Sequence, residues 1–130
     1  MKSISELKKE QQDKLSAIFE KYGIFFAFNA KQFNQQKEKG VKYVSGNMGM
    51  IIPKDRVDDF HAAYQQYSKE CVAEHQKHIP MDNYIAYELA NYEALYTGDM
   101  TEAFGAVQAF YPECTLKDMW RVYKDQRNNH

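Results

Sequence analysis

Apolar residues recur at helical spacing over the first 22 positions of the chain. They fall on one face of an amphipathic stretch: Leu7, Leu15, Ile18, Phe19 and Tyr22. Ser3 and Glu6 form a capping-box pattern at the start of this stretch, and Gly23 follows its last apolar residue. We therefore predict a helix over about residues 3–22.

The period of the pattern then changes from that of a helix to that of short strands. Residues 24–28 form a compact apolar run between Gly and Asn, which is typical of a buried strand. Residues 41–45 and 48–52 flank Gly46-Asn47, a pair that tolerates positive φ and favours a hairpin turn. These segments predict a small antiparallel sheet of about three strands.

Helical spacing returns between and after the predicted strands. The predicted helices cover residues 30–39, 53–78, 82–97, 99–110 and 115–127. Their starts are marked by Asn29, Pro53, Asp82, the box Asp99–Glu102 and the box Thr115–Asp118. Residues 127–130 are expected to fray. The expected fold is α+β, a small antiparallel sheet packed by five to six helices, with a helical C-terminal half and one domain over residues 1–130.

The longest predicted helix carries an apolar stripe that includes two imidazoles and a thiol. Its members keep a spacing of three or four residues: Val57, Phe60, His61, Tyr64, Tyr67, Cys71, Val72 and His75. We predict that this stripe lies inward and supports the sheet, so that its imidazoles and thiol serve packing.

Charge is divided by position along the chain, although the net charge is only −1. Residues 1–56 carry 11 Lys/Arg against 6 Asp/Glu, a balance of +5, whereas residues 57–114 carry 2 against 10, a balance of −8. Residues 115–130 carry 4 against 2, a balance of +2. This division predicts a polarised surface, and the ten Tyr and eight Phe suit a binding surface or a core with a wet rim.

Cysteine usage and hydropathy bear on the compartment. The two cysteines, Cys71 and Cys114, are typical of reduced thiols rather than of a disulfide framework. The polar N-terminal segment lacks the pattern of a signal peptide, and the apolar run 24–28 is far too short to span a bilayer. We therefore expect a cytoplasmic protein without a membrane partner.

Two groups of residues have candidate chemistry. Cys71, His75 and His78 share a helical face at the spacing of metal ligands, with Glu74 as the nearest further donor. No second ligand cluster is evident, so packing is the favoured interpretation, and no metal, cofactor or catalytic residue is assigned. Glu88 lies within an apolar stripe, where a carboxylate needs a partner. A structural hydrogen-bond hub is favoured over a functional site.

Basic residues cluster around the predicted sheet. They are Lys31, Lys37, Lys39, Lys42, Lys54 and Arg56, with Tyr43 among them. Clustered cations beside an exposed ring are typical of nucleic-acid binding, although Glu38 and Asp55 dilute the cluster. The acidic middle of the chain instead favours a protein-binding patch with electrostatic selectivity.

Three motifs, in this order, resemble a known family. They are Phe25-Phe26-Ala27-Phe28 with Gln32-Phe33, then Gly46-Asn47-Met48-Gly49 with Pro53-Lys54-Asp55, then Glu88-Leu89-Ala90-Asn91-Tyr92-Glu93 with Thr97-Gly98-Asp99. The chain resembles small uncharacterised proteins encoded by bacteriophages, prophages and other mobile elements of bacteria. Members of that family tend to have His where this chain has Tyr92. The resemblance implies an accessory protein that binds a host or phage macromolecule, and it implies no catalytic mechanism.

The leading hypothesis is therefore a non-enzymatic accessory protein of phage or mobile-element type that binds a protein partner. A host-derived partner and homo-oligomers are left open. One alternative is a nucleic-acid-binding protein that uses the basic residues around the sheet. Another is a small metal-dependent enzyme built on His61, Cys71, His75 or Glu88. The candidate binding residues are Gln32, Lys37, Lys39, Lys42, Tyr43, Glu88, Asn91, Glu93 and Asp99.

Overall fold

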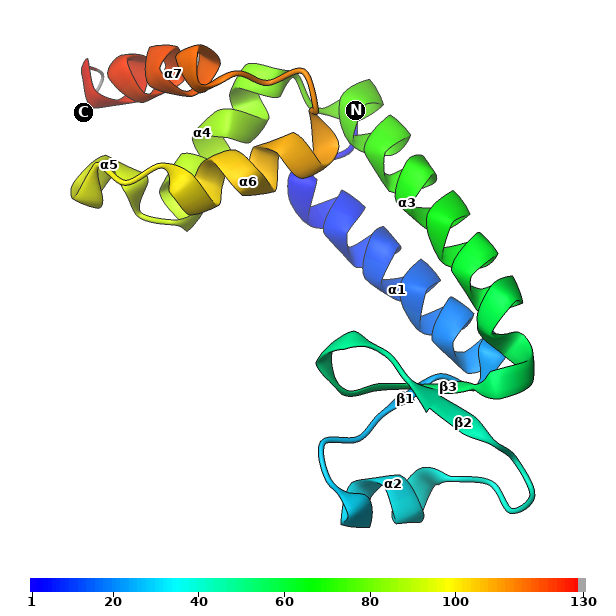
Figure 1. Ribbon diagram of the computed structural model, residues 1–130. Helices are drawn as coiled ribbons and strands as arrows, with labels where there is room; N and C mark the ends of the chain where they lie inside the picture. The colour runs from blue at the N-terminus through cyan, green and yellow to red at the C-terminus, as the bar shows by residue number, and fades with distance from the viewer. Residues whose placement is uncertain (129–130) are drawn as a thin grey trace. The chain divides into compact units, whose positions relative to one another are not determined.

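A computed structural model describes residues 1–128 of the chain, and it has the expected α+β fold (Figure 1). The α-helices are α1 (Ile4–Tyr22), α2 (Ala30–Gln36), α3 (Val57–His78), α4 (Met81–Asn91), α5 (Ala94–Thr97), α6 (Thr101–Phe110) and α7 (Leu116–Asn128). The strands are β1 (Phe25–Phe26), β2 (Tyr43–Ser45) and β3 (Met50–Pro53), and short 3-10 turns cover Asn47–Gly49 and Lys54–Arg56. Among the described helices, none combines the length and the apolar character needed to cross a membrane.

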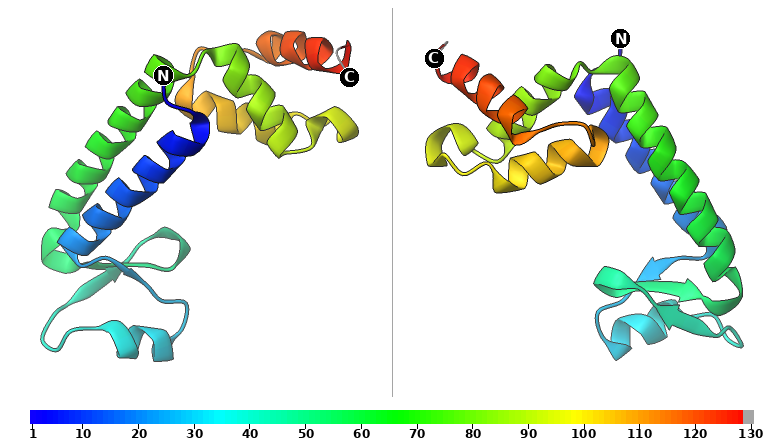
Figure 2. Two further views of the ribbon diagram at one scale, coloured as in Figure 1. Left: turned by 180° about the vertical axis from the view of Figure 1, so that it is seen from behind. Right: turned by 45° about the horizontal axis from the view of Figure 1, so that its top comes forward.

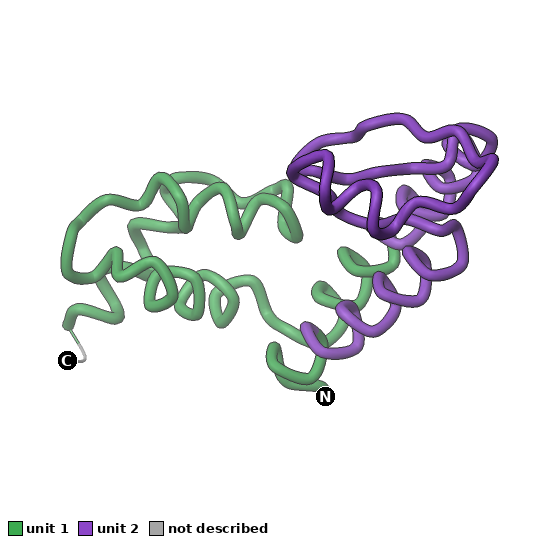
Figure 3. Tube along the Cα trace, turned by 90° about the horizontal axis from the view of Figure 1, so that it is seen from below, with its two compact units in different colours: residues 1–7, 70–130 green, residues 8–69 purple. Residues whose placement is uncertain are grey.

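The described chain divides into two compact units, which Figure 3 colours separately. The sheet unit is Lys8–Lys69, and the helical unit is Met1–Leu7 together with the chain from Glu70 onward. The boundaries fall within α1 and within α3. The expectation of one domain stays a prediction, and each unit is described by itself.

The sheet unit is built on three antiparallel strands in the order β1-β3-β2, as predicted. One face of the sheet, with Phe25, packs against Phe33 of α2. The other face packs against α1 and α3, where Ile24, Ile52 and Phe60 form the buried core. A strand buries alternate side chains on opposite faces, so even this small sheet needs a cover on both sides.

Several boundaries in the sheet unit differ from the prediction. The longest helix, expected from Pro53, begins at Val57, because Pro53 ends β3 and a 3-10 turn covers Lys54–Arg56. The strand expected from residue 41 begins at Tyr43. The strand expected over 24–28 covers only Phe25–Phe26, and the Phe28 amide, which faces the free edge of β1, donates to Gln32 Oε1 at 2.7 Å. The helix expected over 30–39 ends at Gln36, because Lys37 is extended. The hairpin turn is not confined to Gly46-Asn47: its residues of positive φ are Met48 (φ 58°) and Gly49 (φ 78°), and β3 begins only at Met50.

The helical unit contains the larger core. Helices α6 and α7 both pack against α4, and the three helices lie together in both views of Figure 2. The buried cluster also includes Leu7 of α1: Leu7, Ile79, Tyr84, Ile85, Leu89, Ala94, Met100, Ala103, Val107, Tyr111, Cys114, Met119, Val122 and Tyr123. The buried residues of these helices recur at the predicted spacing of three or four residues.

Helix ends in this unit both confirm and correct the capping predictions. The box at Thr115 is formed, since the Asp118 amide donates to Thr115 Oγ1 (3.2 Å) and the Thr115 amide donates to Asp118 Oδ2 (3.0 Å). Asp82 is not a cap, because α4 begins at Met81 with Pro80 before it. At α6, Asp99 Oδ1 accepts from the Thr101 amide (3.0 Å), but Met100 holds the cap position.

The helix expected over 82–97 is interrupted. It divides into α4 and α5, because Glu93 adopts a left-handed conformation (φ 55°) that no α-helix accommodates. At the chain end, α7 continues through Asn128. Of the expected frayed end, 127–130, the last two residues lie outside the described part of the chain.

The predicted inward stripe of α3 is only partly buried. In the sheet unit Phe60 is buried, whereas His61 and Tyr64 are exposed. In the helical unit Cys71 and His75 are buried, as expected. The stripe therefore leaves one stretch of α3 open on the side of the sheet.

Candidate functional site

The sheet unit carries an open groove of about 870 Å³ between α3, β1 and the β2–β3 hairpin. We call it the apolar groove, and its lining residues are Phe26, Phe28, Gly46, Asn47, Met48, Met50, Ile52, Phe60, His61, Tyr64 and Gln65. All of them belong to the sheet unit. Carboxylates, lysines and thiols do not occur among these lining residues, so the groove is chiefly aromatic and aliphatic.

Alternation along the strands aims side chains into this groove. Phe26 pairs with Met50 across β1 and β3, and Ile52 lies two residues further along the same face. On α3, Phe60 and Tyr64 are four residues apart and therefore share a helical face. The groove is thus the uncovered end of the same sheet face whose other part forms the buried core.

Residues before α2 are held by two glutamine side chains. Gln32 Oε1 accepts from the Phe28 amide, and Gln36 Nε2 donates to the Phe26 carbonyl at 2.9 Å. In the register of β1 with β3 these two backbone groups point away from β3, so the glutamine side chains satisfy the free edge of β1. Gln32, a predicted binding residue, therefore positions Phe28 at the groove.

The hairpin turn forms the opposite rim and contains a strained residue. Met48 adopts a left-handed conformation, which costs a non-glycine residue about 1 kcal/mol or more. Gly49 also has positive φ, and a Cβ added there would lie 2.6 Å from Cε1 of Phe28. The Phe28 ring therefore packs directly on the turn backbone, which only glycine permits.

Large apolar side chains around the groove are unusually exposed. The exposed fractions are 39% for Phe26, 74% for Phe28, 87% for Met48 and 42% for Tyr64. Single exposed apolar residues are ordinary, but a contiguous group of them marks a binding surface. Met48 is both strained in its backbone and exposed to water, which is a second reason to regard this surface as a candidate binding site.

The opposite face of the sheet has a smaller hollow of about 400 Å³ beside α2. Tyr43 lines it and is half-buried, with its ring packed edge-on against Phe25 (5.3 Å) and Phe33 (5.7 Å). Its hydroxyl accepts from the Glu38 amide at 3.0 Å. Tyr43 is therefore not the free ring expected among the lysines.

The predicted binding residues fall in different units. Gln32, Lys37, Lys39, Lys42 and Tyr43 belong to the sheet unit, and Glu88, Asn91, Glu93 and Asp99 belong to the helical unit. Within the helical unit, Glu88 is 3% exposed, whereas the other three are exposed. Neither unit therefore gathers the nine residues into one site.

Charge follows the same division into units. The sheet unit carries 11 Lys/Arg against 7 Asp/Glu, a net +4, and the helical unit carries 6 against 11, a net −5. The positional charge separation seen in the sequence is therefore a separation between two compact bodies. The apolar groove lies in the positive one.

The proposed metal ligands on α3 are engaged in packing. The His75 ring stacks on Phe110 with centroids 3.7 Å apart, and its Nδ1 lies 3.2 Å from the Cys71 carbonyl oxygen. His78 Nδ1 accepts from the Lys2 amide, and its Nε2 lies 3.4 Å from Glu74. Over residues 1–128, no three His, Cys, Asp or Glu side chains are grouped as metal ligands.

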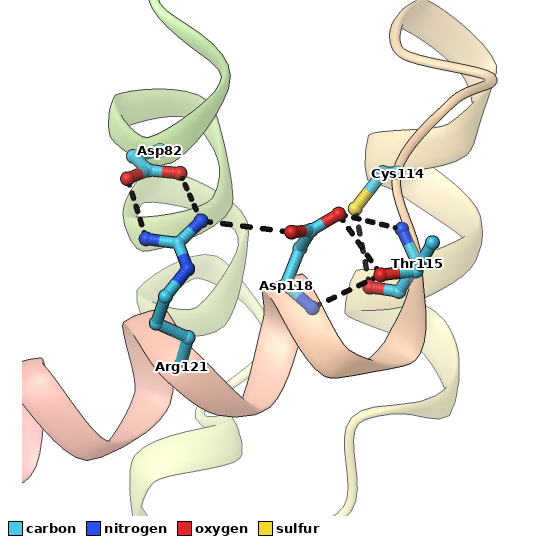
Figure 4. A network of polar contacts seen from close by, with 5 residues as sticks. All are labelled: Asp82, Cys114, Thr115, Asp118 and Arg121. Carbon is cyan, nitrogen blue, oxygen red and sulfur yellow. Dashed lines mark hydrogen bonds and ion pairs between the residues drawn. The ribbon is translucent and has the colours of Figure 1, made fainter.

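Both thiols of the helical unit are buried, and a network of polar side chains links two of its helices. Burial raises the pKa of Cys114 to about 11, so its thiol stays protonated at neutral pH. Figure 4 shows the network that joins α4 to α7, in which Arg121 donates to both Asp82 oxygens at 2.7 and 2.8 Å. The hydrogen bond from Arg121 lowers the pKa of Asp82, and the Thr115 amide lowers that of Asp118.

Sequence reasoning missed the residues that make the groove. Phe26, Phe28 and Met48 fall in predicted strands, and Tyr64 falls in the stripe of the long helix that was predicted to lie inward. The available signal was the three Phe within 25–28, since a short edge strand beside a small sheet cannot bury every ring.

The fold is α+β, and the sheet unit has an open apolar groove. Over residues 7–126 the chain matches a family of unknown function, DUF7659, and belongs to it. A search of curated proteins finds no match, and a search of solved structures finds none.

Proposed function

We propose that this protein is a non-enzymatic binding module that takes an apolar segment of a protein partner into the apolar groove. The observation that carries the proposal is the exposure of Phe26, Phe28, Met48 and Tyr64 around one groove. Aromatic residues and Met are enriched at protein interfaces, where their burial supplies much of the binding free energy. Met also adapts to partners of different shape.

The rim of the groove favours a macromolecule over a small ligand. Small-molecule sites surround most of the ligand surface. Phe28 and Met48 instead project into solvent, so a compound lying in the groove would leave most of both side chains exposed to water. A protein segment that crosses the groove and rests on its rim would bury them.

The lining residues favour binding over catalysis. His61 is the only imidazole among the lining residues, and neither a carboxylate nor a thiol accompanies it there. General acid–base or nucleophilic catalysis generally uses a second group that orients or activates the first. The phage or mobile-element origin expected from the sequence stays a prediction.

Site-specific photo-cross-linking in cells tests the proposal. A photoreactive amino acid is placed at position 48, on the groove rim, and separately at position 96, where Tyr96 is exposed in the helical unit. We expect a discrete protein adduct from position 48, identified by mass spectrometry, and none of that mass from position 96. Phe28→Ser should remove the adduct, and the purified partner should bind the wild-type protein with a measurable Kd.

Two outcomes of this experiment would contradict the proposal. Equal adducts from both positions, or an adduct that survives Phe28→Ser, would show that the groove is not the docking surface. Circular dichroism of Phe28→Ser checks that the unit is folded, as the exposure of this side chain predicts.

Nucleic-acid binding is the second candidate, because the exposed lysines of the sheet unit are concentrated near α2 and β2. Lys37, Lys39 and Lys42 are all exposed. The packed ring of Tyr43 argues against base stacking there. Gel-shift titration with single-stranded and duplex DNA and RNA at low salt is the test. Reversing the three lysine charges should weaken any binding and reduce its salt dependence.

A further inference from the structure

We propose that the apolar groove selects an acidic partner segment, one in which apolar side chains alternate with Asp or Glu. This inference rests on the proposed function and adds the chemical class of the partner. It follows from where the positive charge of the sheet unit lies and from what surrounds it.

The positive charge comes from a single stretch of chain. Residues 31–56 contain 6 Lys/Arg and 2 Asp/Glu, a net +4, which equals the net charge of the whole sheet unit. The rest of the unit, 8–30 and 57–69, carries 5 of each sign and is neutral. The field of this unit is therefore set by α2, the loop after it and the hairpin.

The same stretch builds one wall of the groove. The hairpin contributes Gly46, Asn47, Met48, Met50 and Ile52 to the lining. Ile52 of this lining lies two residues before Lys54, so a segment lying in the groove comes near Lys54 and its cross-strand neighbour Lys42. The lysines of α2 belong to the opposite face of the sheet and add only to the net charge of the unit. The apolar side chains of such a segment would face the groove, and its other side chains would face the field of the lysines.

Two of these lysines stand opposite one another at the open end of the hairpin. Tyr43 pairs with Pro53, and the Lys54 amide donates to the Lys42 carbonyl at 2.8 Å, so Lys42 and Lys54 are cross-strand neighbours. Like charges in this position repel and destabilise the pair. Within residues 1–128, no ion pair neutralises either lysine. An approaching carboxylate would relieve that repulsion.

Complementary charge increases the selectivity of an apolar interface and the rate at which its partners associate. Opposite fields steer encounter over about one Debye length, roughly 8 Å at physiological ionic strength. An acidic segment also avoids the like-charge repulsion that a basic one would meet. A nucleic acid satisfies the lysines but offers phosphates, not side chains, to the groove.

Selection from a displayed library of random peptides tests the inference even while the natural partner is unidentified. The full-length protein is the bait, and the Met48→Ser protein serves for counter-selection, so that only groove-dependent peptides survive. We expect the survivors to combine aromatic or aliphatic residues with an excess of Asp and Glu. The affinity of one selected peptide, fluorescein-labelled, should fall at least about tenfold between low and high salt.

Two double variants with the same change in net charge test which lysines affect peptide binding. Lys42→Glu with Lys54→Glu should weaken binding of that peptide at least about tenfold and remove most of its salt dependence. Lys9→Glu with Lys14→Glu changes the net charge equally on exposed positions of α1 and should have a much smaller effect. Met48→Ser and Phe28→Ser should weaken the acidic peptide and a version with Asn and Gln in place of Asp and Glu alike.

Each of the other possible outcomes would contradict one part of the proposal. Survivors that are neutral or basic, with binding lost in Met48→Ser, would overturn the acidic partner and leave the docking groove standing. A library with no groove-dependent survivors would overturn both. Concentration-dependent self-association that Met48→Ser abolishes would make a second copy the occupant. An oligonucleotide that needs Lys42 and Lys54 but not Met48 would make the partner a nucleic acid.

Discussion

The two units of this protein treat their apolar side chains in opposite ways. The helical unit gathers 14 buried residues into one core, whereas the continuous core of the sheet unit consists of Ile24, Ile52 and Phe60. The sheet unit is nevertheless rich in rings, and several of them line the apolar groove instead of entering the core. A unit that leaves this much apolar surface in water gains less stability from burial and retains surface for binding.

Charge sharpens the contrast between the units. The helical unit is acidic and contains the Asp82–Arg121 pair, while the sheet unit is basic and its lysines near the hairpin are unpaired with any carboxylate among the described residues. A charged group that already forms an ion pair gains less from a new partner of opposite charge. The helical unit has the larger share of buried apolar surface, and the proposed binding surface lies in the sheet unit.

The largest expected effect is on the core of the helical unit. Leu89 is fully buried, so Leu89→Ala should lower the free energy of unfolding of this unit by about 2–5 kcal/mol. Trp120, the only tryptophan, lies in α7 beside Tyr123 and reports unfolding of this unit by fluorescence. The matched control Leu116→Ala, at an exposed position of α7, should change it by less than about 0.5 kcal/mol. Equal effects of both variants would contradict the assignment of the core.

The next effect is on the turn of the sheet unit. Gly49→Ala places a side chain at positive φ, which costs about 1–2 kcal/mol, and pushes the Phe28 ring off the turn. Gly40→Ala has the same backbone penalty, with φ +82°, but meets no atom within 4 Å. Denaturation followed by far-ultraviolet circular dichroism should show a loss for both variants, and only Gly49→Ala should also weaken partner binding. Unchanged binding in Gly49→Ala would separate Phe28 from the docking surface.

Met48→Gly should improve stability and impair function at once. Glycine adopts positive φ without the steric penalty, so the sheet unit should gain about 0.5–1 kcal/mol. The same change removes the most exposed side chain of the groove rim and should weaken binding of the partner. Denaturation and a binding titration on one preparation measure both. A destabilised Met48→Gly protein with full binding would show that Met48 serves the fold, not recognition.

Most of the fold is predictable because its signals are local. The 3/4 spacing, the boxes at Ser3 and Thr115 and the hairpin flanked by apolar runs each depend on residues a few positions apart. The boundaries that were wrong depend on non-local or competing bonds. Gln32 Oε1 accepts from the Phe28 amide at the free edge of β1, and Glu93 adopts a left-handed conformation between α4 and α5.

The groove was not predictable, because burial is a property of the whole surface. Phe60 and Tyr64 obey the same periodicity on α3, yet one is buried and the other is exposed. Which of them is covered depends on how far a three-stranded sheet reaches along the helix. The charge division, by contrast, was visible in the sequence, and its coincidence with the two units required the structure.

The smallest expected effect concerns the ion pair of the helical unit. Asp82→Asn should lower the free energy of unfolding by about 0.5 kcal/mol at neutral pH, because both partners are half exposed and solvent screens them. The pKa of Asp82 is lowered by Arg121 in the folded protein, so its contribution is present above the unfolded pKa of about 3.9. It should disappear as the pH falls through the lower, folded pKa.

A pH series of denaturation midpoints for the wild type and Asp82→Asn checks this sign. The difference between the two proteins should be constant from neutral pH to about pH 5 and shrink to zero at lower pH, where Asp82 is protonated in both states. Asp125→Asn removes the same charge from an exposed position of α7 and should show no comparable step. If the Asp82→Asn difference grew as the pH fell, the pair would be destabilising. The helical unit would then owe its stability to the buried core alone.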